Sequence, residues 1–225
     1  MEPDEGTPPT DRQASITARL VDYQAVRLYL RMLGNWEVWT AAIGALFCKI
    51  TRYSFLFWLP LYLTQRRGYT TGEAGYTSSI FKLAGFGGAL LVGYVSDKLM
   101  QSRRLPVAAM MMWGLAVACW LHPWLAEHGR WGGALGIALI GIMNHGPDSV
   151  LQGAAAQDIG TRWGVGKTSG FINGVSSVGQ LISAYLVGTV SQRYSWDVLF
   201  YVFMALAFAG GSVLATRLRH ANPMR

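Results

Sequence analysis

Long apolar stretches separated by short polar segments dominate the chain. Six of them approach the roughly 20 residues that an α-helix needs to cross a bilayer. They are residues 36–63, 78–96, 105–126, 132–156, 168–190 and 198–216. A transmembrane barrel would need alternating strands of about ten residues, a pattern that we do not find. The sequence therefore predicts an all-α membrane domain of six transmembrane helices at 36–216, because helices satisfy their own backbone hydrogen bonds in lipid.

The flanking segments carry different patterns. Residues 1–13 are acidic and contain Pro, which predicts a disordered lead. Residues 14–35 alternate apolar side chains with arginines, which is typical of an amphipathic helix lying on the membrane surface. A helical extension of the first span would give the same pattern, so both interpretations stay open. Residues 217–225 form a short basic tail.

Charge placement argues against binding of nucleic acid. The net charge is +7, but only 14% of residues are charged, against about a quarter in soluble domains. With six spans, twelve of the 19 Lys and Arg fall on one side of the membrane and four on the other. The positive-inside rule then places both termini in the cytoplasm. We expect a multi-pass protein of a lipid bilayer, in the plasma (inner) membrane of a bacterium, with no nucleic-acid partner.

Two cations interrupt the first span. Lys49 and Arg52 are three residues apart, which places them on one helix face. Each costs about 2.5 to 3.5 kcal/mol at the centre of a bilayer. The pair therefore needs a partner helix, a water-filled cavity or an anionic ligand. The alternative is a structural ion pair within the bundle, or a Lys49 side chain that extends to the membrane–water interface.

A polar group interrupts the fourth span. Asn144, His145 and Asp148 surround Gly146-Pro147, and a Pro inside a membrane helix frees backbone groups and favours a kink. Such side chains are costly in lipid unless they face water or partners. They predict the lining of a cavity, or else a kinked helix near the membrane surface.

Small residues recur at helix-packing spacing on two spans. They are Gly85, Ala89 and Gly93 on the second, and Gly170 and Gly174 on the fifth. Because small residues let helix backbones approach closely, both spans are expected to be crowded by neighbours. Cys48 and Cys119 fall within spans and are expected to be small buried fillers.

Several motifs point away from catalysis. Residues 164–168 (GVGKT) resemble a phosphate-binding loop, but Thr161 replaces its first glycine and no strand precedes it. The four histidines have no metal-site spacing, and no Ser/His/Asp set has a local signature. We therefore expect no enzyme activity, no cofactor and no metal.

The end of the second span carries a family signature. The sequence Gly93-Tyr94-Val95-Ser96-Asp97-Lys98, followed by Arg103 and Arg104, resembles the motif between the second and third helices of each half in the major facilitator superfamily. The resemblance implies that Asp97 accepts hydrogen bonds from a neighbouring helix N-terminus while the bases hold the cytoplasmic face. Gly93, Asp97, Lys98, Arg103 and Arg104 would then form a gating motif.

The run from Lys49 to Tyr62 resembles the seventh helix of the organophosphate:phosphate antiporters and sugar-phosphate exchangers. Gly146-Pro147 and Asp158–Thr161 resemble that family's tenth helix and following loop. The resemblance implies the C-terminal half of such a transporter, a 3+3 inverted repeat, and exchange by alternating access. Arg52 stands where the family binds substrate phosphate. The implied substrate-binding set is Arg52, Lys49, Tyr53, Lys82, Asn144, His145 and Asp148.

Two positions depart from the family pattern. Phe57 replaces an acid five residues after Arg52, and Lys82 replaces an acid of the eighth helix. Both changes make this half more cationic, which favours an anionic substrate. We therefore expect transport of a phosphorylated or other anionic metabolite, exchanged for inorganic phosphate. The alternatives are a sugar-phosphate sensor, or a split or non-functional half whose partner is a separate N-terminal half or a second copy.

Overall fold

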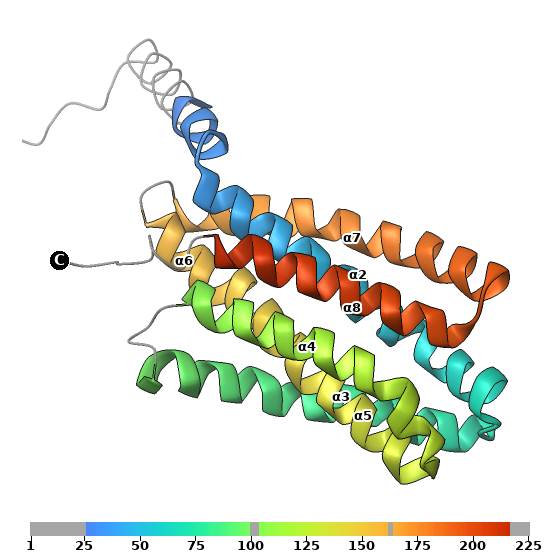
Figure 1. The fold of residues 1–225 in the computed structure, drawn as a ribbon. Helices are drawn as coiled ribbons and strands as arrows, with labels where there is room; N and C mark the ends of the chain where they lie inside the picture. Colours follow the sequence, from blue (N-terminus) through green and yellow to red (C-terminus); the bar gives the residue numbers. More distant parts are fainter. Residues whose placement is uncertain (1–25, 100–103, 162–163, 217–225) are drawn as a thin grey trace, which may run out of the picture.

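The computed structural model describes residues 26–99, 104–161 and 164–216, in which all regular structure is helical (Figure 1). The elements are α2 (Trp36–Arg67), α3 (Thr71–Tyr94), the π-helical segment η1 (Val95–Leu99), α4 (Arg104–Glu127), α5 (Gly129–Ser149), the π-helical segment η2 (Val150–Ala154), α6 (Ala155–Gly160), α7 (Val165–Arg193) and α8 (Trp196–Ala215). The predicted all-α class is confirmed. The predictions for 1–13, the first part of 14–35, Arg103 and 217–225 lie outside the described residues.

Local capping explains where the first long helices begin and end. Asn35 Oδ1 accepts the Glu37 N–H at 2.7 Å, and Gly68 ends α2 in the left-handed region at φ 68°. Thr70 and Glu73 form a capping box at the start of α3. Residues 26–33 form a helix that Gly34 and Asn35 separate from α2, and both interpretations of residues 14–35 stay predictions. Val26 and Leu30 on this short helix remain exposed.

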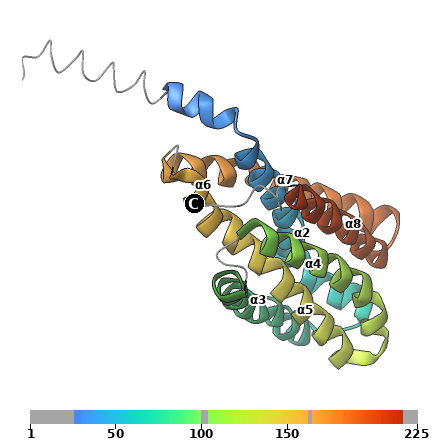
Figure 2. The ribbon, with the colours of Figure 1, turned by 60° about the vertical axis from the view of Figure 1, so that its left-hand side comes forward.

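Helix pairing shows an internal repeat. α2 packs on α7 and α8, whereas α5 packs on α3 and α4, and α4 and α8 pack on each other. If α2 corresponds to α5–α6, α3 to α7 and α4 to α8, each of these contacts has an equivalent in the other set. The α2–α7 contact then corresponds to α5–α3, and α2–α8 corresponds to α5–α4. The helices therefore form the two three-helix sets expected of a 3+3 repeat. α3 and α7 lie at opposite edges of the bundle in both views (Figures 1 and 2).

Membrane character is clear for most of the bundle. Five helices in the described part of the chain are long and apolar enough to cross a membrane: α2, α3 with η1, α4, α7 and α8. α5 is not among them, because glycines and the polar group at 144–148 lower its hydropathy. The count of six spans therefore stays a prediction.

The core joins the two sets through aromatic side chains. Phe55 of α2 lies 5.5 Å from Phe81 of α3 and 5.3 Å from Phe203 of α8 between ring centroids. Cys48 and Cys119 are fully buried, as expected of small fillers. These contacts hold α2 in the middle of the bundle, where its polar face meets α5 and α7.

The glycine predictions divide in two. Gly85 is confirmed as a close-approach position, since a Cβ there would lie 2.3 Å from His145 Nδ1. At Gly93, Gly170 and Gly174 a Cβ would meet no atom of the described residues within 4 Å, so crowding at these three positions stays a prediction. Spacing alone does not say which way a small-residue stripe faces, and on α7 it faces outward.

Candidate functional site

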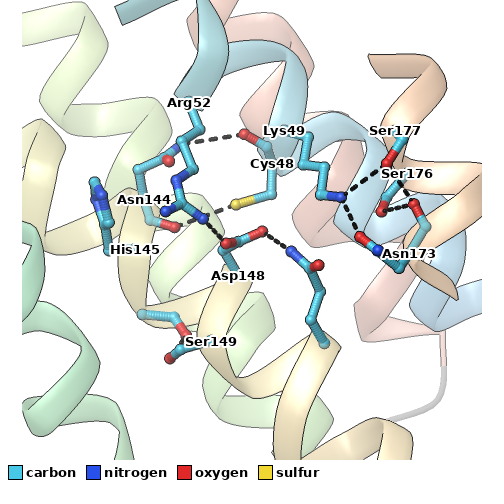
Figure 3. A network of polar contacts seen from close by, with 12 residues as sticks. Cys48, Lys49, Arg52, Asn144, His145, Asp148, Ser149, Asn173, Ser176 and Ser177 are labelled. Carbon is cyan, nitrogen blue, oxygen red and sulfur yellow. Dashed lines mark hydrogen bonds and ion pairs between the residues drawn. The ribbon is translucent and has the colours of Figure 1, made fainter. Parts of the chain in front are cut away.

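Arg52 of α2 is the centre of the site, and it reaches Asp148 of α5 (Figure 3). Arg52 NH1 donates to Asp148 Oδ2, and Gln152 Nε2 of η2 donates to Oδ1 of the same carboxylate. Asp148 is nearly buried, at 6% side-chain exposure, whereas the Arg52 side chain keeps 32%. A guanidinium has five N–H donors. The buried Asp148 carboxylate therefore balances the charge of Arg52, while the exposed part of the Arg52 side chain keeps N–H donors for a ligand.

Lys49 turns to the other neighbour of α2. Its Nζ donates to Asn173 Oδ1 at 2.6 Å and to Ser177 Oγ at 3.2 Å, both on α7 (Figure 3). Lys49 is buried, with 3% of its surface exposed. Although Lys49 and Arg52 are one turn apart, they reach different helices. Lys49 thus links α2 to α7, and Arg52 links α2 to α5.

Asn144 and His145 serve packing contacts. Asn144 is fully buried, and its Nδ2 donates to the Cys48 carbonyl at 3.3 Å, while Cys48 Sγ donates to the Asn144 carbonyl at 3.2 Å. His145 Nδ1 lies 3.0 Å from the Gly141 carbonyl, and its ring packs edge-on to Phe81 at 4.9 Å. Asn144 thus belongs to the α2–α5 contact and His145 to the α3–α5 contact.

Tyr53 and Lys82 form no hydrogen bond or ion pair with Arg52 or Asp148 among the described residues. The Tyr53 ring is half-buried and lies 5.9 Å from Phe57 on the same helix. Lys82 is exposed on α3 and has no ion-pair partner in the part of the chain that the structure describes. Lys82 therefore leaves an unbalanced positive charge on an open helix face.

The gating motif forms a cluster around Arg104, the first residue of α4. Arg104 NH1 donates to Asp97 Oδ1 at 2.7 Å and to Ser96 Oγ at 3.2 Å. Arg104 Nε lies 3.6 Å from Asp158 Oδ2 on α6. We call Asp97, Arg104 and Asp158 the Arg104 cluster. Lys98 is exposed beside it.

Sequence reasoning missed several partners. Lys49 is bound by Asn173 and Ser177, and the Asp148 carboxylate is bound by Gln152. These partners are ordinary polar residues that belong to no sequence motif. Their one signal is spacing, because Asn173 and Ser177 share a face of α7. Asp148, Gln152 and Asp158 lie on the consecutive helical elements α5, η2 and α6. This continuous helical segment connects the site to the Arg104 cluster.

Removing Arg104 tests the cluster. We expect Arg104→Gln to leave overall stability within about 1 kcal/mol, because its acidic partners are half exposed and exposed pairs contribute little. Local opening should increase, giving roughly 2- to 5-fold faster amide hydrogen exchange at 95–99 and 155–160. Lys98→Gln, which removes a neighbouring exposed cation, is the control. Equal exchange rates in the two variants would contradict a holding role for Arg104.

Comparison with known proteins identifies the family. Residues 2–162 match the Major Facilitator Superfamily. The chain belongs to this superfamily. With its apolar helices, the match shows a multi-pass membrane protein, as the sequence predicted.

The relatives have related names. A glycerol-3-phosphate transporter of Haemophilus influenzae is 30% identical over 82% of this chain and 40% of the relative. A probable hexose phosphate transport protein of Chlamydia pneumoniae is 28% identical over 90% of this chain and 43% of the relative. Sugar phosphate exchanger 3 of Homo sapiens is 29% identical over 70% of this chain and 33% of its own length. These names confirm the resemblance to the organophosphate antiporter group. The chain spans less than half the length of these relatives.

Proposed function

We propose that the chain is part of a secondary transporter that exchanges phosphorylated metabolites for inorganic phosphate by alternating access. The partly exposed side chain of Arg52 carries the proposal. Its fork of donors matches phosphate oxygens, which bind guanidinium bidentately. The names of the relatives, which handle glycerol-3-phosphate and sugar phosphates, support the same class of solute. The unbalanced charge of Lys82 adds positive potential on an open face.

Asp148 would compete with the substrate phosphate for the Arg52 guanidinium. The Arg52–Asp148 pair ties α2 to α5. A phosphate that takes the guanidinium releases this tie, and the freed carboxylate stays hydrogen-bonded to Gln152 on η2. Because π-helical segments are local irregularities that often mark functional sites, we place the adjustment of α5–η2–α6 at η2. A carrier whose helices are released only by an anion moves only when loaded, which is the condition for exchange.

The open edges of the bundle suggest what completes the cavity. Gly170 and Gly174 of α7 meet nothing within 4 Å, and Lys82 of α3 is exposed. Small residues on an exposed membrane helix allow another helix to approach closely. We propose that a second six-helix unit covers this face, either a separate N-terminal half or a second copy of the chain. Cross-linking from Gly174→Cys, with the lipid-facing Val117→Cys as control, should capture it.

The test of function is counter-exchange in liposomes. The chain and a candidate partner half are reconstituted around internal phosphate, and uptake of labelled phosphate is measured. We expect uptake to depend on internal phosphate, and glycerol-3-phosphate and hexose phosphates to compete better than dicarboxylates. Uptake without internal phosphate would refute exchange. Binding without any uptake would favour a sensor.

Asp148→Asn separates binding from movement. Without the competing carboxylate, phosphate affinity should rise about tenfold, because one ion pair no longer has to be broken. Uptake should also lose its dependence on internal phosphate, since the ion pair that ties the unloaded helices is gone. Equilibrium binding and exchange rate are measured together, with Glu37→Gln at the start of α2 as the control. An affinity that falls would show that Asp148 orients Arg52 rather than competing for it.

A further inference from the structure

A polar cavity lies at the end of the bundle opposite to the Arg104 cluster. It has a volume of about 100 Å³ and lies between the C-terminal ends of α2 and α4 and the start of α5. Its polar and small lining residues are Tyr62, Arg67, Tyr69, His122, Arg130 and Gly133. We call it the Arg67 cavity. This volume holds several water molecules, and hence a small solute.

Two guanidinium groups line the Arg67 cavity. Arg67 is 16% exposed, donates its Nε to Tyr62 Oη at 2.8 Å and places NH2 3.3 Å from Asp197 Oδ1. Arg130 lies 5.3 Å from the ring centroid of Tyr69 and forms an ion pair with Glu73. The Asp197 and Glu73 carboxylates that pair with these arginines are not among the residues that line the cavity. Each guanidinium has five N–H groups, so donors remain for a ligand.

Two neutral groups lie beside the guanidinium groups, and the Tyr69 hydroxyl donates to the Arg130 carbonyl at 3.4 Å. Burial raises the pKa of the Tyr69 phenol, which keeps it protonated. His122 is fully buried, with Nε2 3.2 Å from Tyr62 Oη, and its Nδ1 has no partner among the described residues. A buried ring nitrogen without a partner is uncommon in a folded protein. His122 Nδ1 lies against Gly136, which is one turn along α5 from the lining residue Gly133.

The start of α5 faces the same cavity. Gly129 is the first residue of α5 and lines the cavity, and the preceding His128 makes no side-chain capping hydrogen bond. The first N–H groups of a helix have no partner within it, and its macrodipole favours an anion at this end. Two guanidinium groups and the start of a helix without a side-chain cap thus meet at this cavity.

We propose that the Arg67 cavity binds a tetrahedral oxoanion, namely the phosphate group of a free solute or of a lipid. Arg67 follows Arg52 by fifteen residues on α2, so the two sites are about 22 Å apart along the helix. The cavity would then be a docking site that a phosphate-bearing solute occupies on its way to or from Arg52. The choice of phosphate rests on the proposed function, but the cavity is formed by this chain alone.

The test is phosphate binding to the purified full chain without a partner half. Inorganic phosphate is titrated calorimetrically into the protein in phosphate-free detergent. We expect Arg67→Gln to raise the Kd of this site at least tenfold. Arg66→Gln, which removes the neighbouring guanidinium outside the lining, should leave it unchanged. Gly133→Ala adds a methyl group only 3.5 Å from Tyr69 Oη, an ordinary contact, and should weaken binding several-fold without unfolding the protein.

The outcomes separate this site from the proposed function. Arg52→Lys should leave binding at the Arg67 cavity intact, so a failure of transport at Arg52 leaves the cavity result standing. Equal Kd values for Arg67→Gln, Gly133→Ala and Arg66→Gln would overturn the second site. A parallel titration contains a short-chain phosphatidylglycerol. Competition by this lipid identifies a lipid headgroup as occupant, and its absence identifies a free solute.

Discussion

Arg52→Lys should lower phosphate affinity about 10- to 100-fold in the reconstituted transporter with its partner half. A lysine keeps the charge that balances Asp148, so membrane insertion should be retained. It cannot reproduce the planar fork that binds two phosphate oxygens at once. Losing one charge-assisted hydrogen bond costs about 1.5 to 3 kcal/mol, which corresponds to this range. The measurement is the concentration dependence of phosphate exchange, together with the amount of inserted protein.

The matched control is Arg193→Lys, an exposed arginine at the end of α7. It makes the same chemical change far from Asp148 and should leave exchange within experimental error. Unchanged affinity in Arg52→Lys would remove Arg52 from the site and leave the Arg52–Asp148 pair with a structural role alone. Complete loss of inserted protein would instead show that the pair is needed for folding.

Gly88→Ala should destabilise the protein by about 1 to 3 kcal/mol, the usual cost of overpacking a tight contact. A Cβ at Gly88 would lie 2.2 Å from the backbone oxygen of Ile142, so α3 must move away from α5. A backbone atom cannot rotate aside as a flexible side chain can. The measurement is thermal unfolding in detergent.

Gly87→Ala on the same helix is the control, because a Cβ there meets nothing within 4 Å. It should be neutral or slightly stabilising, since alanine favours helix formation over glycine. Because α3 leads to Asp97 in η1, Gly88→Ala should also alter the Arg104 cluster. If both alanine variants unfold at the same temperature, α3 and α5 are not in the close contact described.

The sequence located the helices well because apolar length is a local property. All six predicted spans fall on helices, and Arg52 and Asp148, both predicted to be site residues, form an ion pair. The gating motif likewise placed Asp97 near Arg104. What the spacing could not give was the direction of each side chain. Lys49 and Arg52 share a helix face, yet they bind α7 and α5 respectively.

Composition and hydropathy were enough to determine a helical membrane protein, and the motifs around Arg52 and Asp97 indicated its superfamily. These features depend on residues close together in the chain and on the energetic cost of charge in lipid. Tertiary structure alone decided that Asp148 balances Arg52, that the glycines of α7 face outward, and that Arg67, His122 and Arg130 converge on one cavity. Those relations join residues up to about a hundred positions apart, so they depend on how the helices rotate and cross when they pack.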